Sequence, residues 1–110
     1  MTRVMMTALA VLISVAGLGA QDAKKVAAGK DLYQKYACEK CHQIAGKGSK
    51  ISPLDGVGAK LTADEIKQWI VDPDSMTAKL AKKPAAKMKK IAMPDPEVDA
   101  LVAYLQTLKK

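Results

Sequence analysis

The sequence contains no phenylalanine, one tryptophan and three tyrosines, so few bulky side chains are available to fill a hydrophobic core. A chain of 110 residues has room for one small domain and leaves none for a catalytic domain beside it. Domains of this size are often only marginally stable without a disulfide, a metal or another staple. A large buried prosthetic group would supply the missing apolar volume.

Arginine and histidine are also scarce. The only arginine is Arg3, so the rest of the chain lacks the side chain that most often reads nucleic-acid bases. We therefore expect no nucleic-acid partner, and we interpret the net charge of +7 as a surface that favours acidic proteins. The only histidine is His42, and no cluster of cysteine or histidine exists beyond Cys38, Cys41 and His42, which excludes a four-ligand zinc site.

The one long apolar run lies at the N-terminus. Arg3 precedes the apolar residues 4–13, and small residues follow up to Ala20, as in a secretory signal peptide. We predict a signal peptide over residues 1–20, cleaved near Ala20 or Ala23, followed by a single domain over residues 21–110 in the periplasm. The alternative is a retained membrane anchor, although a run of about 17 residues spans a bilayer only marginally.

Two segments of the mature chain have helical sequence patterns, and we predict that these two helices cross. The first spans about residues 22–37 and contains Gly29, which costs about 1 kcal/mol relative to alanine inside a helix. A glycine at such a position indicates that another helix crosses closely there. The last helix begins near Asp95, and its apolar residues share one face: Val98, Leu101, Val102, Leu105 and Leu108.

The remaining segments predict one more clear helix and two irregular regions. Thr62 and Glu65 match a capping box, which predicts a helix that ends before Pro73. Residues 42–61 are rich in glycine, lysine and serine and predict a wrapping loop. Residues 75–83 predict at most a short helical piece. Because no segment shows the alternation of a strand, we predict an all-α fold of three to four helices.

The strongest motif is Cys38-Glu39-Lys40-Cys41-His42, the C-x-x-C-H signature of covalent haem attachment. Each thiol adds across one vinyl group, and the two intervening residues let the cysteines reach neighbouring vinyls. The adjacent histidine is then carried under the ring, where its Nε2 can meet the iron. The spacing therefore predicts one covalent haem c, with His42 as an axial ligand.

Two other interpretations of the cysteines remain weaker. A thioredoxin-like dithiol needs a strand followed by a helix around its C-x-x-C, and the sequence shows no such context. A structural disulfide between Cys38 and Cys41 would close almost no loop and would stabilise little. It would also leave the neighbouring His42 unexplained.

Over the whole mature length, the chain resembles a class I bacterial monohaem cytochrome c. The resemblance rests on Gly29 with Tyr33, on the motif at residues 38–42, on Pro53-Leu54-Asp55-Gly56-Val57-Gly58, and on Leu101-Val102-Ala103-Tyr104-Leu105. It implies a small cytochrome c fold in which the first and last helices cross at Gly29, with Tyr33, Leu101 and Tyr104 around the contact. It also implies a loop carbonyl, from residue 52 or 53, that accepts a hydrogen bond from His42. Trp69 has two interpretations, a haem contact and a core residue.

The second axial ligand must come from methionine, because His42 is the only histidine. Met76, Met88 and Met93 are the candidates, and the ordinary role of a methionine is to fill a core. In similar cytochromes the ligand lies in a loop before the last helix, and Met88, sixteen residues before Tyr104, matches that position. We therefore predict Met88, with Met93 as the alternative.

The function that this resemblance implies is one-electron transfer without enzymatic activity or a small-molecule substrate. We predict a periplasmic carrier that meets membranes only through redox complexes. The alternatives are a small subunit of a larger oxidoreductase and an open-site haem enzyme or gas sensor. Acidic redox partners would dock where six lysines flank the ligand loop: Lys79, Lys82, Lys83, Lys87, Lys89 and Lys90.

Overall fold

The computed structural model of the chain describes residues 16–110, with side-chain burial from Asp22 onward. Helices dominate the described residues, and the fold is all-α, as predicted. In chain order the elements are α1 (Ala16–Lys35), a 3-10 turn η1 (Cys38–Lys40), β1 (His42–Ile44), β2 (Lys47–Gly48), β3 (Ser52–Pro53), α2 (Val57–Lys60), α3 (Ala63–Val71), α4 (Pro73–Ala78) and α5 (Asp95–Gln106).

The predicted signal peptide lies largely at residues 1–15, outside the described residues, so its cleavage stays a prediction. The described chain begins inside α1, six residues earlier than the helix start that the sequence indicated. None of the described helices has both the length and the apolar character needed to cross a membrane.

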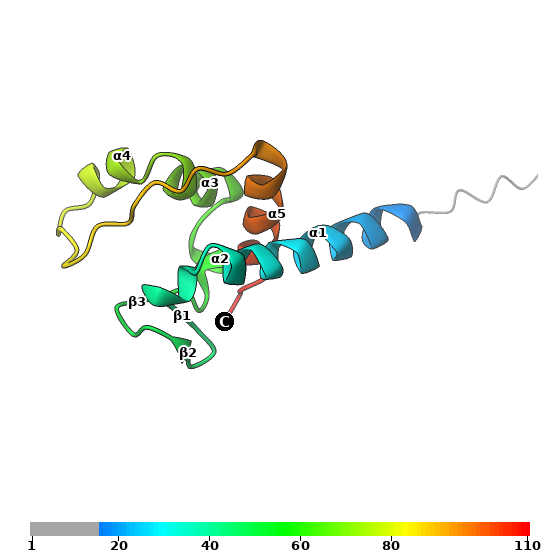
Figure 1. The fold of residues 1–110 in the computed structure, drawn as a ribbon, viewed down its shortest axis with the longest axis horizontal. Helices are drawn as coiled ribbons and strands as arrows, with labels where there is room; N and C mark the ends of the chain where they lie inside the picture. Colours follow the sequence, from blue (N-terminus) through cyan, green and yellow to red (C-terminus); the bar gives the residue numbers. More distant parts are fainter. Residues whose placement is uncertain (1–15) are drawn as a thin grey trace, which may run out of the picture.

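Helices α1 and α5 cross at Gly29, as predicted (Figure 1). A Cβ atom on Gly29 would collide with the Ala100 carbonyl oxygen and would lie 2.6 Å from the Tyr104 Cβ. The aromatic rings of Tyr33 and Tyr104 meet beside this crossing, edge to face, with centroids 6.1 Å apart. Glycine is needed here because only a residue without a side chain lets the two backbones approach so closely.

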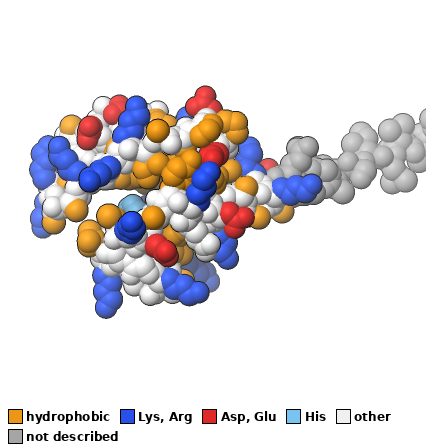
Figure 2. All heavy atoms as spheres, viewed as in Figure 1, with side chains coloured by type: hydrophobic (Ala, Val, Ile, Leu, Met, Phe, Trp, Pro, Cys, Tyr) orange, Lys and Arg blue, Asp and Glu red, His pale blue; other side chains and the backbone are white. Residues whose placement is uncertain are grey.

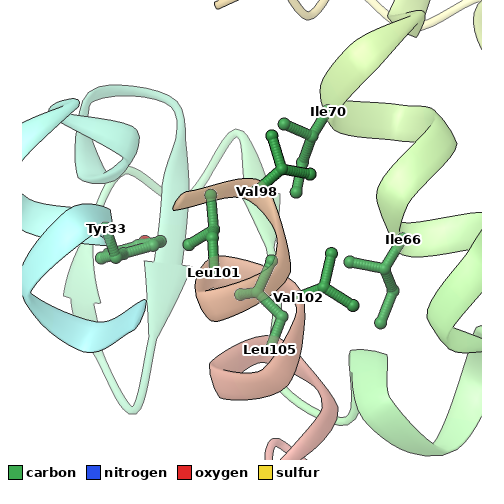
Figure 3. Packing of buried hydrophobic residues seen from close by; sticks show 7 residues of the cluster. All are labelled: Tyr33, Ile66, Ile70, Val98, Leu101, Val102 and Leu105. Carbon is green, nitrogen blue, oxygen red and sulfur yellow. The ribbon is translucent and has the colours of Figure 1, made fainter. Parts of the chain in front are cut away.

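The buried core lies between α1, α5 and α3, with α5 in the middle (Figure 3). The apolar face predicted for the last helix is buried except at its end, where Leu108 is half-buried. On the other side of α5, Ile66 and Ile70 of α3 complete the cluster. The core is small because most of its members are Val, Ile and Leu, as expected for a chain without phenylalanine.

The two ends of α3 form as the sequence indicated. The Thr62 hydroxyl accepts from the Glu65 backbone N–H at 3.2 Å, and the Glu65 carboxylate accepts from the Thr62 N–H at 3.1 Å. At the other end, Asp72 separates α3 from α4, and Pro73 takes the first position of α4. This short helix is the helical piece expected near residues 75–83, but it begins and ends earlier.

The region predicted as a loop, residues 42–61, contains more order than the sequence indicated. Strand β1 pairs with β2 in antiparallel and with β3 in parallel orientation, which makes a sheet of two- and three-residue strands. Helix α2 follows, and the Gly58 backbone N–H donates to the Leu108 carbonyl at 2.8 Å. These short elements hold the segment after His42 in one conformation, which positions the site described next.

Candidate haem-binding site

The C-x-x-C-H motif begins where α1 ends. Ala37 takes a left-handed conformation, with φ 54° and ψ 39°, and turns the chain out of α1 into η1. The Cys41 backbone N–H donates to the Cys38 carbonyl at 3.2 Å, which closes one 3-10 turn. Cys38 is the first residue of this turn, and Cys41 follows its last residue as the C-cap.

Both cysteines are free thiols, although they lie in one turn. Cys38 is half-buried against the core, and its burial raises the pKa of its thiol. Cys41 is exposed. The turn therefore offers one inner and one outer sulfur, which suits bonding to two points along the edge of a planar group.

The imidazole of His42 is fixed by a backbone carbonyl. Its Nδ1 lies 2.9 Å from the Ser52 carbonyl oxygen. Because a carbonyl only accepts hydrogen bonds, Nδ1 carries the proton and Nε2 keeps a free lone pair. A bond of this kind orients the ring and raises the basicity of the ligating nitrogen. From the sequence, the carbonyl of either residue 52 or residue 53 could be the acceptor. In the structure the acceptor is the carbonyl of Ser52.

The small sheet explains why the Ser52 carbonyl lies there. In the parallel ladder, His42 is paired with Ser52 and Gln43 with Pro53. The Ser52 N–H donates to the Cys41 carbonyl at 3.1 Å, and the Leu54 N–H donates to the Gln43 carbonyl at 2.8 Å. Pairing of β1 with β3 thus sets the position of the acceptor.

A cavity opens in front of the imidazole, and the pale-blue His42 is visible in the hollow of Figure 2. Its lining combines four of the predicted site residues, all except Cys41, with side chains from α1, α3, α5, the loop after β3 and the segment before α5. The lining residues are Tyr33, Cys38, His42, Leu54, Ile70, Met88, Ile91, Met93, Leu101 and Leu105.

The structure brings Cys38, His42, Met88 and Met93 to this one cavity, whereas Cys41 is exposed and is not among the lining residues. Met76 lies elsewhere: it is half-buried on α4, with the Lys79 ammonium 4.0 Å from its sulfur, and it does not line the cavity. Trp69 is half-buried on α3 and belongs neither to the cavity lining nor to the core cluster, so neither interpretation of Trp69 is confirmed.

The residues present fit a haem. An imidazole with a free Nε2 and a methionine thioether are known axial ligands of haem iron, and two thiols in one turn can form the covalent bonds. Apolar side chains make up most of the remaining lining. Such a wall excludes water and suits a porphyrin face.

Sequence reasoning missed two features of this cavity. The first is the Tyr33 side chain, which was assigned to helix packing and which also lines the cavity. The second is the set of aliphatic walls at Leu54, Ile70 and Ile91. Aliphatic residues give no chemical signal in a sequence, because the same residue types fill any core.

Comparison with known proteins agrees with this geometry. The sequence profile of the family described as Cytochrome c matches residues 26–109. No curated protein and no solved structure matches the chain. The matched region contains the C-x-x-C-H motif, the crossing of α1 with α5 at Gly29 and every residue that lines the cavity. The chain therefore belongs to the cytochrome c family, whose members bind covalently attached haem c and transfer electrons through it.

Proposed function

We propose that this chain is a periplasmic one-electron carrier whose haem c is bonded to Cys38 and Cys41 and ligated by His42 and Met88. The observation that carries the proposal is the cavity that gathers Cys38 and His42 of the C-x-x-C-H motif and the distant Met88, from two separate parts of the chain. The haem iron supplies the chemistry, which is exchange of one electron between its ferric and ferrous states. The protein supplies ligands, an apolar wall and a docking surface.

The packing of the two methionines favours Met88 as the ligand. Both line the cavity, but only Met93 also packs against the buried core cluster. Met93 lies just before α5, where a core contact fixes the approach of the chain to the helix. Met88 lies in the irregular segment between α4 and α5 and has no such second role. Its thioether is therefore the one free to serve as a ligand.

The lining of the cavity supports a carrier rather than an enzyme. Apart from the Cys38 thiol, the His42 imidazole and the Tyr33 hydroxyl, the lining consists of aliphatic and methionine side chains. His42 is already bonded through Nδ1 to Ser52. The lining thus offers no separate acid or base to act on a substrate. His42 and Met88 would hold the haem, and an iron that keeps both protein ligands would exchange electrons fast.

The lysines near the ligand segment support a partner with an acidic surface. All six lysines named for this surface are exposed. Among the described residues, the only ion pair joins Lys35 to Glu97, so the six charges are not neutralised within the chain. Figure 2 shows lysine side chains around the end of the molecule where the hollow opens. Such a field steers acidic proteins toward this end.

The start of the described chain is compatible with export. Residues 22–25 of α1 are exposed, so the described residues next to the predicted cleavage sites take no part in the buried core. The periplasmic location rests on this observation and on the signal-peptide pattern of residues 1–20.

Visible spectra of three proteins test the proposal: the wild type, Met88→Ala and Met93→Ala, each in both redox states. We expect the wild type to titrate reversibly as a one-electron couple. The Met88→Ala variant should lose the ferric methionine-to-iron charge-transfer band and should bind carbon monoxide when reduced. The matched Met93→Ala variant should keep the band. Loss of the band in Met93→Ala alone would assign the ligand to Met93, and carbon monoxide binding to the wild type would reject the carrier.

A further inference from the structure

The segment after His42 turns back on itself in a hairpin. Ala45 and Gly46 form the two-residue connection between β1 and β2, with φ angles of 51° and 82°. Positive φ at both central residues is required by a type I′ turn, in which asparagine or aspartate followed by glycine is the usual pair. Alanine suits the first position less well, because an L side chain adopts the left-handed region at a cost. A contact from outside the hairpin would stabilise this turn.

The Asp55 side chain makes such a contact. Its Oδ1 accepts a hydrogen bond from the Ala45 backbone N–H at 2.8 Å, and the residue is half-buried. Asp55 lies between β3 and α2, so this bond joins the β1–β2 hairpin to the segment that follows β3 (Figure 1). Hydrogen bonds to an ionised carboxylate are stronger than those between neutral groups.

The carboxylate stands where the ladder between β1 and β3 would place a backbone carbonyl. In this ladder the Leu54 N–H donates to the Gln43 carbonyl at 2.8 Å. If the regular parallel pattern continued, the Ala45 N–H would donate to the Leu54 carbonyl. That carbonyl instead accepts from the Val57 N–H at 3.0 Å, where the chain turns into α2. The Asp55 carboxylate takes the Ala45 N–H in its place and extends the ladder by one bond.

We propose that Asp55 is a positioning residue for the haem iron, acting through the carbonyl that holds His42. This inference rests on the proposed ligation by His42. The Ser52 carbonyl lies 2.9 Å from the His42 Nδ1 because β1 and β3 keep their register, and the Asp55 carboxylate fixes one end of that register. Without this acceptor the ladder would loosen and the bond to Nδ1 would weaken. A weaker bond lowers the basicity of the ligating nitrogen, which favours ferrous over ferric iron.

Two substitutions at this position separate the hydrogen bond from the charge. Asp55→Asn removes the charge but keeps an oxygen that can accept from the Ala45 N–H, whereas Asp55→Ala removes both. In the haem-loaded proteins at one applied potential, we expect a ferrous-to-ferric ratio roughly threefold higher in Asp55→Ala than in Asp55→Asn, which is a midpoint potential higher by about 30 mV. Exchange of the Ala45 amide proton and of the His42 Nδ1 proton, followed by NMR, should be about tenfold faster in Asp55→Ala than in Asp55→Asn.

Equal potentials and equal exchange rates in the two variants would overturn the proposal, because only the charge of Asp55 would then matter. The wild type decides if Asp55→Ala does not load haem. Its Ala45 amide and His42 Nδ1 protons should exchange through one shared local opening, and independent exchange of the two protons overturns the proposal. The mass of the wild-type peptide that contains Cys38 and Cys41 separates this failure from failure of the attachment, since haem on that peptide leaves the proposed function standing.

Discussion

The bond between His42 and the Ser52 carbonyl is the smallest feature on which the site depends. The acceptor is a backbone oxygen that the β1–β3 ladder positions, so the serine side chain takes no part in it. In a sequence, a serine at position 52 could be taken for a residue whose hydroxyl orients His42. In the structure the backbone carbonyl of Ser52 does so instead.

We therefore expect Ser52→Ala to leave the visible spectrum and the reduction potential unchanged. The substitution removes the hydroxyl and keeps the carbonyl that accepts from Nδ1. A contrasting variant is Gly48→Ala: Gly48 has φ +103°, and a Cβ there would collide with the His42 carbonyl. This variant should disturb the ligand and lower the denaturant midpoint. A potential shift in Ser52→Ala equal to that in Gly48→Ala would show that the side chain matters.

At the residue scale, the sequence predicted the haem-attachment residues better than it predicted the acceptor for His42 or the methionine ligand. The C-x-x-C-H spacing is a chemical requirement and can be recognised directly in the sequence. The acceptor for His42 could be narrowed only to residues 52 and 53, because a carbonyl has no sequence signature and depends on strand register. The methionine could be narrowed only by resemblance, since Met76, Met88 and Met93 are chemically identical.

The crossing of α1 and α5 is the main contact between elements. It brings the end of α1, with the attachment turn, to the face of α5 that lines the cavity. A glycine inside a helix would otherwise be a weakness. Here it permits the approach that closes one side of the site.

Substitution of Gly29 tests this contact. Gly29→Ala gains helix propensity worth about 1 kcal/mol but forces a methyl group into the Ala100 carbonyl. Overpacking of this kind outweighs the gain, so we expect a net loss of about 1–3 kcal/mol in the free energy of unfolding, measured with denaturant on the haem-loaded protein. The exposed neighbour provides a control: Lys30→Ala should stay within about 0.5 kcal/mol of the wild type. An unchanged or raised stability in Gly29→Ala would argue against close packing there.

The junction of α3 and α4 gives a pH-dependent prediction. The Asp72 carboxylate accepts from the Ser75 N–H at 3.4 Å. Hydrogen bonding to Ser75, first from its side chain and then from its backbone, lowers the pKa of Asp72. An aspartate with a lowered folded-state pKa stabilises the fold above its unfolded pKa of about 3.9 and loses that contribution as the pH falls. The wild type should therefore be more stable than Asp72→Asn at pH 6, and the difference should shrink below pH 4. Asp74→Asn, which removes one charge and leaves the Asp72 carboxylate in place, is the control, and an equal loss in both variants would exclude the charge of the capping group as the cause.

Among the elements, the long amphipathic helices could be predicted from the sequence, whereas the short strands and the short helix α2 could not. The Thr62 capping box and the apolar face of α5 are local patterns that tertiary contacts reinforce. Strands of two or three residues are too short to alternate, and α2 has only four residues. Their order comes from contacts distant in sequence, such as Gly58 with Leu108, which no local pattern encodes.

At the scale of the whole molecule, charge is distributed unevenly around the cavity. Lysines dominate the segment from α4 to α5, while carboxylates lie on α3 and α5 at positions such as Asp64, Glu65, Asp95 and Asp99. A molecule with this asymmetry turns its lysine-rich end toward a negative partner before contact.

Kinetics of electron exchange with hexacyanoferrate(II) test this orientation. The triple variant Lys82→Gln, Lys83→Gln, Lys87→Gln should react several-fold more slowly than the wild type at low ionic strength, and the difference should vanish at high salt. The matched triple variant Lys24→Gln, Lys25→Gln, Lys30→Gln removes the same charge from the part of α1 that precedes Tyr33 and does not line the cavity. Equal slowing in both triples would mean that only net charge matters.

Every larger property depends on a covalent bond between the polypeptide and a porphyrin. Mass spectrometry of protein exported alongside haem-attachment machinery, after acid–acetone extraction and proteolysis, examines that bond. The peptide containing Cys38, Cys41 and His42 should carry the mass of one haem and retain its colour. A colourless peptide of unmodified mass, with both thiols open to alkylation, would refute the assignment of this turn as the haem attachment site.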